Sequence, residues 1–186
     1  MLEAAARLMQ RQGYAATGLL EITEESQAPK GSLYHYFPGG KEQLAAEAVG
    51  RGGRAMSSVL KATLDSTTNL ANGFERLAEM LALNLERSDF YEGCPVATVT
   101  LETASGSEAI QEASAECFRA WQTRIETRLV EQGHPPDVAA MRATLLISAF
   151  EGALIMARAE RDVAPLRRTA QALRPLLAPV TGEDRV

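Results

Sequence analysis

The sequence predicts an all-helical protein with two parts, a helix-turn-helix domain over residues 1–50 and a larger helical domain over residues 51–186. Alanine and leucine are abundant, β-branched runs are short, and most of the 14 glycines and 8 prolines fall between periodic apolar segments. With 46% hydrophobic and 23% charged residues, the composition is that of a globular domain. About nine helices are expected from the apolar periodicity.

The first expected helix starts at the beginning of the chain. Its apolar residues follow helical spacing, and Gly13 suits a C-terminal cap. These residues are Leu2, Ala5, Ala6 and Met9. Because the periodic pattern is already under way at residue 1, we expect either that this chain lacks a few upstream residues or that those residues are not ordered.

Two short helices are predicted next. Thr17 can cap a helix over residues 19–25, since its hydroxyl suits that position. Residues 26–28 form a tight connection, and Pro29 suits the first turn of a helix over residues 30–36.

The remaining helices follow from apolar periodicity and from proline and glycine punctuation. They are expected over residues 41–64, 74–85, 95–104, 106–132, 138–161 and 165–177. Ser105 with Glu108 forms a possible capping box, and Asp137 can cap the following helix. Three glycines, at residues 50, 52 and 53, weaken the helix over residues 41–64, and a break there is the alternative.

Several classes of protein do not fit the sequence. The longest uncharged run outside the loops lies near residues 143–150 and ends at Glu151, whereas a membrane span needs roughly 18 apolar residues. The N-terminus has no signal peptide pattern, so we expect a cytoplasmic protein. Cys94 and Cys117 lack metal-ligand spacing, and we expect both to be reduced, with one disulfide as the alternative.

Catalysis is not indicated by any motif. His35 and His134 are the two histidines, and neither lies beside a recognisable nucleophile or metal-binding pattern. We therefore expect no catalytic site, no metal and no cofactor. An enzyme is one competing class, and a helical interaction module that has lost DNA binding is another.

The segment from Thr17 to Leu44 predicts a helix-turn-helix, because two short helices are joined by about three residues. In that motif the second helix lies in the DNA major groove. Charge does not support this prediction directly: the net charge is −5, residues 1–54 are neutral with six basic and six acidic side chains, and residues 55–186 carry the excess.

Polar aromatic side chains crowd the second helix of this motif. Tyr34, His35 and Tyr36 offer aromatic surface and hydrogen-bonding groups for DNA. The alternative is that aromatics here belong to the core of a small bundle, and we accept it for Leu33 and Phe37.

The run SLYHYFPGGKEQL over residues 32–44, together with Gly13 and Tyr14, resembles the DNA-binding domain of the TetR family of repressors. The segments GCPVATVTLETAS and SAFEGALIMARAERD resemble the ligand domain of the branch named after a lincomycin-resistance regulator. The resemblance implies a transcription regulator, and we interpret it as a repressor released from DNA by a small apolar or aromatic molecule. The basic residues that usually precede the first helix in this family are absent here.

The resemblance also implies roles for single residues. Those expected at base edges, at the start of the recognition helix, are Lys30, Gly31 and Ser32. Those expected at phosphates are Thr17, Tyr34, Tyr36 and Lys41, with His35 between the two tyrosines. Gly31 would also allow a close approach of backbone to DNA.

The larger domain is expected to dimerise and to bind the effector. Residues 143–157 are apolar almost all round, and their small side chains would let a second helix approach closely. Dimerisation through the last two helices matches the family and would present two recognition helices to a palindromic operator. Burial within one domain is the alternative. Candidate pocket residues are Met80, Asn84, Phe90, Tyr91, Cys94, Phe118, Trp121, Phe150 and Met156.

Overall fold

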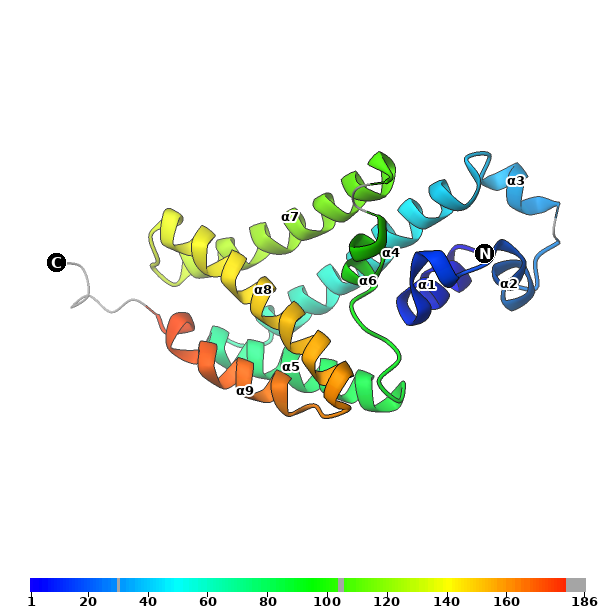
Figure 1. The fold of residues 1–186 in the computed structure, drawn as a ribbon. Coiled ribbons are helices and arrows are strands. Elements are labelled where there is room, and N and C mark those ends of the chain that lie inside the picture. The colour runs from blue at the N-terminus through cyan, green and yellow to red at the C-terminus, as the bar shows by residue number, and fades with distance from the viewer. Residues whose placement is uncertain (30, 104–105, 180–186) are drawn as a thin grey trace. The chain divides into compact units, whose positions relative to one another are not determined.

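The computed structural model describes residues 1–29, 31–103 and 106–179, and within these ranges it consists of nine α-helices and one 3₁₀ turn, without a strand (Figure 1). In chain order the elements are α1 (Leu2–Ala16), α2 (Leu19–Glu25), α3 (Ser32–Tyr36), α4 (Gly40–Asp65), α5 (Leu70–Arg87), α6 (Pro95–Thr103), α7 (Glu108–Glu131), α8 (Pro136–Glu160), α9 (Ala164–Leu173) and η1 (Arg174–Leu177). The all-helical prediction is confirmed.

A kink at Gly13 interrupts α1 before its last turn. Gly13 has a φ of 82° and a ψ of 177°, a left-handed conformation that side chains other than glycine rarely adopt. Residues 14–16 form the remaining turn. The sequence correctly placed the end of regular helix at this glycine.

The helix α2 has the predicted bounds, but its predicted cap is wrong. Its N-cap is Gly18, which has no side chain to accept a hydrogen bond. The hydroxyl of Thr17 instead donates to the carbonyl oxygen of Gly13 at 2.7 Å and is buried. The polar group of Thr17 is therefore used to hold the kink of α1.

The helix α3 starts at Ser32, two residues later than predicted. Pro29 lies before the helix, where its carbonyl accepts hydrogen bonds from the Ser32 amide at 2.9 Å and the Ser32 hydroxyl at 2.6 Å. Lys30 lies outside the described residues.

The helix α4 continues through its three glycines, as predicted. A methyl group at Gly53 would lie 2.1 Å from Sγ of Cys117, and one at Gly52 would lie 2.8 Å from Cβ of Pro95. These glycines let α6 and α7 approach α4 closely, and the packing offsets their low helix propensity.

The chain divides into two compact units. The first consists of residues 1–56 and 91–118, and the second consists of residues 57–90 and 119–186. This division differs from the expected boundary at residue 50, because residues 91–118 cluster with the N-terminal helices. Within the first unit α6 packs against α1.

In the second unit α9 packs against both α5 and α8, as Figure 1 shows. The rings of Phe74 and Phe150 lie 5.6 Å apart in its core. The 3₁₀ turn η1 replaces the end of the expected last helix, since Pro175 has no N–H for a helical hydrogen bond.

Two other helix starts differ from prediction. The hydroxyl of Ser107 accepts the amide of Ile110 at 3.2 Å and so caps α7, while Ser105 lies outside the described residues. Asp137 lies inside the first turn of α8 and is not its cap, because Pro135 and Pro136 begin that helix.

Candidate nucleic-acid interface and sensing unit

Two buried residues hold α3, and three exposed residues lie between them. Leu33 and Phe37 are buried, which confirms their assignment to the core. Tyr34 and Tyr36 are 63% and 65% exposed, and His35 is exposed as well. Exposed aromatic side chains that lie next to one another can mark an interaction surface.

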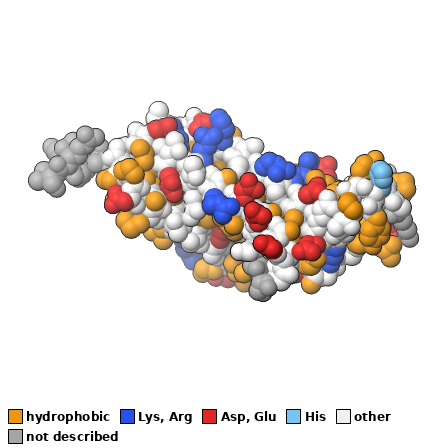
Figure 2. Space-filling view, turned by 90° about the horizontal axis from the view of Figure 1, so that it is seen from above, with side chains coloured by type: hydrophobic (Ala, Val, Ile, Leu, Met, Phe, Trp, Pro, Cys, Tyr) orange, Lys and Arg blue, Asp and Glu red, His pale blue; other side chains and the backbone are white. Residues whose placement is uncertain are grey.

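The exposed residues of α3 form one surface. The rings of His35 and Tyr36 meet edge to face, with centroids 5.0 Å apart. Gly31 is exposed and Ser32 is half-buried, with its hydroxyl donating to Pro29. In Figure 2 hydrophobic-coloured side chains, a class that includes tyrosine, gather around a histidine on the side where Figure 1 places α3.

Helix α2 is oriented by contacts with α1 that involve its acidic residues. Arg7 forms an ion pair with Glu25 at 2.9 Å, and the amide of Gln12 donates to the carboxylate of Glu21 at 2.8 Å. These contacts use two of the carboxylates that would otherwise repel phosphates.

Lys41 lies in the first turn of α4 and is half-buried. Its ammonium donates to the carbonyl oxygen of Ala15 at 3.4 Å and lies 4.4 Å from the centroid of the Tyr14 ring. Burial and the nearby carboxylate of Glu42 raise the pKa of Tyr14, so this ring stays neutral beside the ammonium. An ammonium has three donors, and the one hydrogen bond to Ala15 leaves others for a phosphate.

Thr17 is 0% exposed, so its side chain has no surface with which to touch a phosphate. It supports the turn that leads into α2. We leave Thr17 out of the contact set proposed below.

The predicted pocket residues differ in burial and lie in both compact units. Trp121, Phe150 and Cys94 are buried, whereas the others are half-buried or exposed. Tyr91, Cys94 and Phe118 belong to the first unit, and the remaining six belong to the second. That these residues line an effector pocket stays a prediction.

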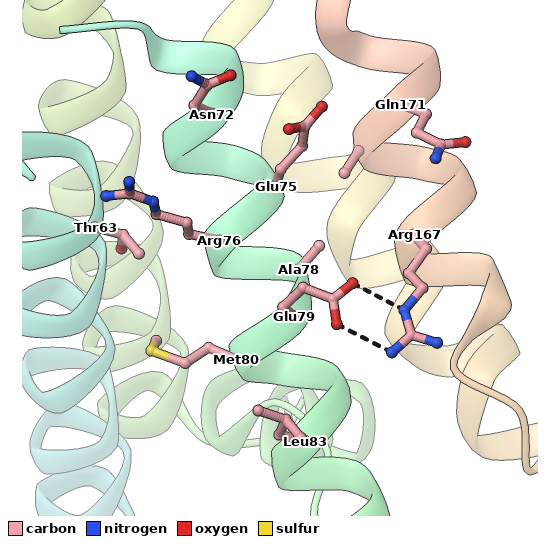
Figure 3. A pocket seen from close by; sticks show the side chains of 11 residues that line it. Thr63, Asn72, Glu75, Arg76, Ala78, Glu79, Met80, Leu83, Arg167 and Gln171 are labelled. Atoms are coloured by element: carbon pink, nitrogen blue, oxygen red, sulfur yellow. Dashed lines mark hydrogen bonds and ion pairs between the residues drawn. The ribbon is translucent and has the colours of Figure 1, made fainter. Parts of the chain in front are cut away.

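A groove that the sequence did not predict runs along α5 between α4 and α9, with a volume of about 900 Å³ (Figure 3). Glu79 and Arg167 meet across it in a paired contact at 2.8 and 3.0 Å, and Arg167 lowers the pKa of Glu79 through this hydrogen bond. Met80 is the residue it shares with the predicted pocket. The feature of the sequence that could have indicated this contact is the opposite charge of side chains on α5 and α9.

The outer face of α8 is apolar and exposed. Its stripe, here named the α8 stripe, repeats every three or four residues and consists of Met141, Leu145, Ser148, Gly152, Ile155 and Ala159. Within the described part of the chain, a methyl group at Gly152 would meet nothing within 4 Å. Among the described helices, α8 alone has the length and apolar composition of a membrane span, and 33% of its most apolar window is buried. Charged residues interrupt this helix, so the length of its uncharged runs does not reveal its apolar composition.

Comparison with known proteins identifies the family. Residues 1–48 match the family described as bacterial regulatory proteins, tetR family, and residues 71–172 match the one described as transcriptional regulator LmrA/YxaF-like, C-terminal domain. The chain is 34% identical over 182 residues to the Bacillus subtilis (strain 168) protein named uncharacterized HTH-type transcriptional regulator YxaF, covering 98% of this chain and 95% of that protein. The chain belongs to the TetR family.

Another relative of this TetR-family protein is the HTH-type transcriptional regulator LmrA of Bacillus subtilis (strain 168). It is 34% identical over 177 residues, which cover 95% of this chain and 94% of LmrA. A TetR regulator from Legionella pneumophila has the same fold, with a TM-score of 0.84, 19% identity and 95% coverage of both chains.

These findings confirm the predicted family and branch. The TetR-family protein is a DNA-binding transcriptional regulator, and its relatives are named as regulators rather than enzymes. Regulators of this family bind operator DNA and small-molecule effectors and work as dimers.

Proposed function

We propose that this TetR-family regulator is a cytoplasmic homodimeric repressor that occupies a palindromic operator and leaves it when a small apolar or aromatic molecule binds. The observation that carries the proposal is the surface of α3. Tyr34, His35 and Tyr36 are exposed together on a helix that Leu33 and Phe37 fix in place. A rigid helix with exposed polar aromatics suits insertion into the major groove.

The proposed DNA contacts fall into two groups. Lys30, Gly31 and Ser32 contact base edges, and Tyr34, Tyr36 and Lys41 contact phosphates, with His35 between the two groups. Phosphate contacts set affinity and orientation, while base contacts set sequence preference. The half-buried ammonium of Lys41, supported by Tyr14 and Ala15, is positioned in advance for a phosphate.

The proposed dimer contact is the α8 stripe with the neighbouring face of α9. A repeat of three and four residues is the spacing with which one helix packs against another. Small side chains at Ser148 and Gly152 permit close approach. A second copy of this chain would remove Ile155 and Met141 from water, which accounts for apolar exposure on a DNA-binding protein.

The proposed effector site lies around Trp121 and Phe150, in the second unit, rather than in the groove along α5. Glutamate and arginine side chains line that groove, and an apolar molecule would have to remove their charges from water. Trp121 and Phe150 offer buried apolar surface instead. Binding there requires core side chains to move, which is how an effector can favour one conformation over another.

The test is selection of duplexes from a random pool by the purified protein. We expect an inverted repeat with half-sites roughly 34–36 Å apart centre to centre, or a multiple of that. Tyr34→Ala is expected to keep the same sequence preference but to bind every duplex more weakly, because Tyr34 is assigned to a phosphate. Recovery of single half-sites, or of no motif, would contradict the proposal.

A further inference from the structure

The peptide groups that follow the kink in α1 are held by two other helices. The amide of Ala15 donates to the carboxylate of Glu102 in α6 at 2.7 Å. The carbonyl oxygen of the same residue accepts from the ammonium of Lys41 in α4 at 3.4 Å. Ala15 thus links a carboxylate on one side to a proposed phosphate-binding lysine on the other.

Gly13 makes the contact with Glu102 possible. A methyl group at this glycine would lie 1.8 Å from Oε1 of Glu102, so any other residue would displace the carboxylate. The left-handed φ of Gly13 turns the next peptide groups out of the helix, where their N–H groups need other partners. The carboxylate of Glu102 supplies such a partner through a charge-assisted hydrogen bond.

Further contacts hold the segment before α6 on α1. The side chain of Gln10 donates to the carbonyl of Gly93 at 2.7 Å, and the guanidinium of Arg11 lies 5.8 Å from the centroid of the Tyr91 ring. Glu102 is therefore a side chain on a docked helix, and its position relative to Ala15 is constrained.

We propose that Glu102 is a positioning residue for operator binding. By holding the amide of Ala15, it restrains the backbone of this residue, whose carbonyl accepts from Lys41. It thereby places the start of α4, which follows α3, over the DNA backbone. The inference rests on the proposed function, because it assigns Lys41 to a phosphate. Glu102 itself touches no DNA in this proposal.

The test compares Glu102→Ala, Glu102→Asp and Glu102→Gln, with Leu101→Ala as the matched control, since Leu101 is 76% exposed on the same helix. Affinities are measured for the selected operator and for a random duplex of equal length. Glutamine keeps an acceptor oxygen at the same reach, whereas aspartate keeps the charge but falls one methylene short. We expect about tenfold weaker operator binding for Ala and Asp, since a charge-assisted hydrogen bond is lost, and near wild-type binding for Gln.

Random-duplex affinity is expected to fall together with operator affinity in Glu102→Ala and Glu102→Asp and to stay near wild type in Glu102→Gln, because Lys41 is assigned to a phosphate and phosphate contacts serve every sequence. Hydrogen exchange of the Ala15 amide, measured without DNA, is expected to be faster in Glu102→Ala and Glu102→Asp but not in Glu102→Gln, because only glutamine keeps an acceptor within reach of this amide. If the Glu102→Ala variant fails to fold, the comparison of Glu102→Asp with Glu102→Gln decides whether Glu102 has a positioning role.

Three results would overturn the inference. If Glu102→Ala and Glu102→Asp bind the operator as tightly as wild type, Glu102 has no positioning role. Tighter binding in both Ala and Gln would show that Glu102 acts only as a negative charge that repels DNA. If the unchanged protein selects no duplex, the proposed function itself fails, and that outcome is separate because it is seen before any variant is made.

Discussion

His134 lies buried just before α8, next to the guanidinium of Arg142. Nη1 of Arg142 lies 2.9 Å from Nδ1 of His134 and donates to the carbonyl of Leu176 at 2.7 Å. Burial first, and the charge of Arg142 second, lower the pKa of His134. A neutral imidazole is therefore part of the folded state.

This predicts an acid-sensitive contribution to stability. The folded-state pKa of His134 lies below the usual 6.5, so below that pH the unfolded chain binds a proton that the folded chain does not. The free energy of unfolding is expected to fall as the pH drops below about 6.5, by up to about 1.4 kcal/mol per pH unit, until the folded pKa is passed. Urea unfolding of wild type and His134→Asn at pH 7.5 and 5.5 measures this. Equal losses in the two proteins would contradict it.

Gly13 and Gly31 are expected to respond differently to substitution by alanine. Gly13→Ala forces a side chain into a backbone conformation that is essentially restricted to glycine, which costs about 1–3 kcal/mol, and also places a methyl group against Glu102. Gly31 has a φ of −69° and open space around it, so Gly31→Ala is expected to be neutral or stabilising by up to about 1 kcal/mol. Thermal unfolding of both variants tests this, and equal shifts in Tm would refute the role of the kink.

At the scale of elements, Ser32 at the start of α3 is assigned to a base edge, and Lys41 in the first turn of α4 is assigned to a phosphate. Lys41→Ala is expected to weaken binding to every duplex and to reduce the slope of log K against log salt by about 0.9, since one phosphate contact is lost. Ser32→Ala is expected to change sequence preference, with about 1–3 kcal/mol at one base pair. Lys61→Ala, an ion-paired lysine at the far end of α4, is the control. An unchanged slope for Lys41→Ala would mean that this lysine serves only Ala15 and Tyr14.

The α8 stripe makes a prediction for the assembly. Ile155→Glu would bury a charge in the proposed interface, and we expect the protein to sediment as a monomer. Val130→Glu is the control, because Val130 is also exposed but lies on α7. Operator binding is expected to fall with the dimer, since two half-sites require two recognition helices. A dimeric Ile155→Glu protein would place the interface elsewhere.

At the scale of the whole molecule, effector and operator are expected to weaken each other's binding affinity by the same factor. Thermodynamic linkage requires that operator weaken effector binding as much as effector weakens operator binding. Trp121 is the single tryptophan and is buried in the second unit, so its fluorescence can report binding of apolar aromatic compounds. Titrations with and without operator measure the factor. A compound that quenches Trp121 with an affinity that operator leaves unchanged is not the inducer.

The sequence by itself determined the helices and the core of the DNA-binding motif. Apolar periodicity and glycine and proline positions predicted the all-helical fold, the bounds of α2 and the burial of Leu33 and Phe37. These features depend on residues within one or two helical turns, where spacing alone decides which side chains share a face.

Only the tertiary structure decided how polar groups are used. Thr17 is buried at the kink rather than capping α2, and Lys41 is held by Ala15 and Tyr14. The groove along α5 depends on partners 88 residues apart, and Glu102 meets Ala15 across 87. Local patterns cannot show such pairs, because the exposure and hydrogen bonding of a polar side chain depend on which distant segment packs against it.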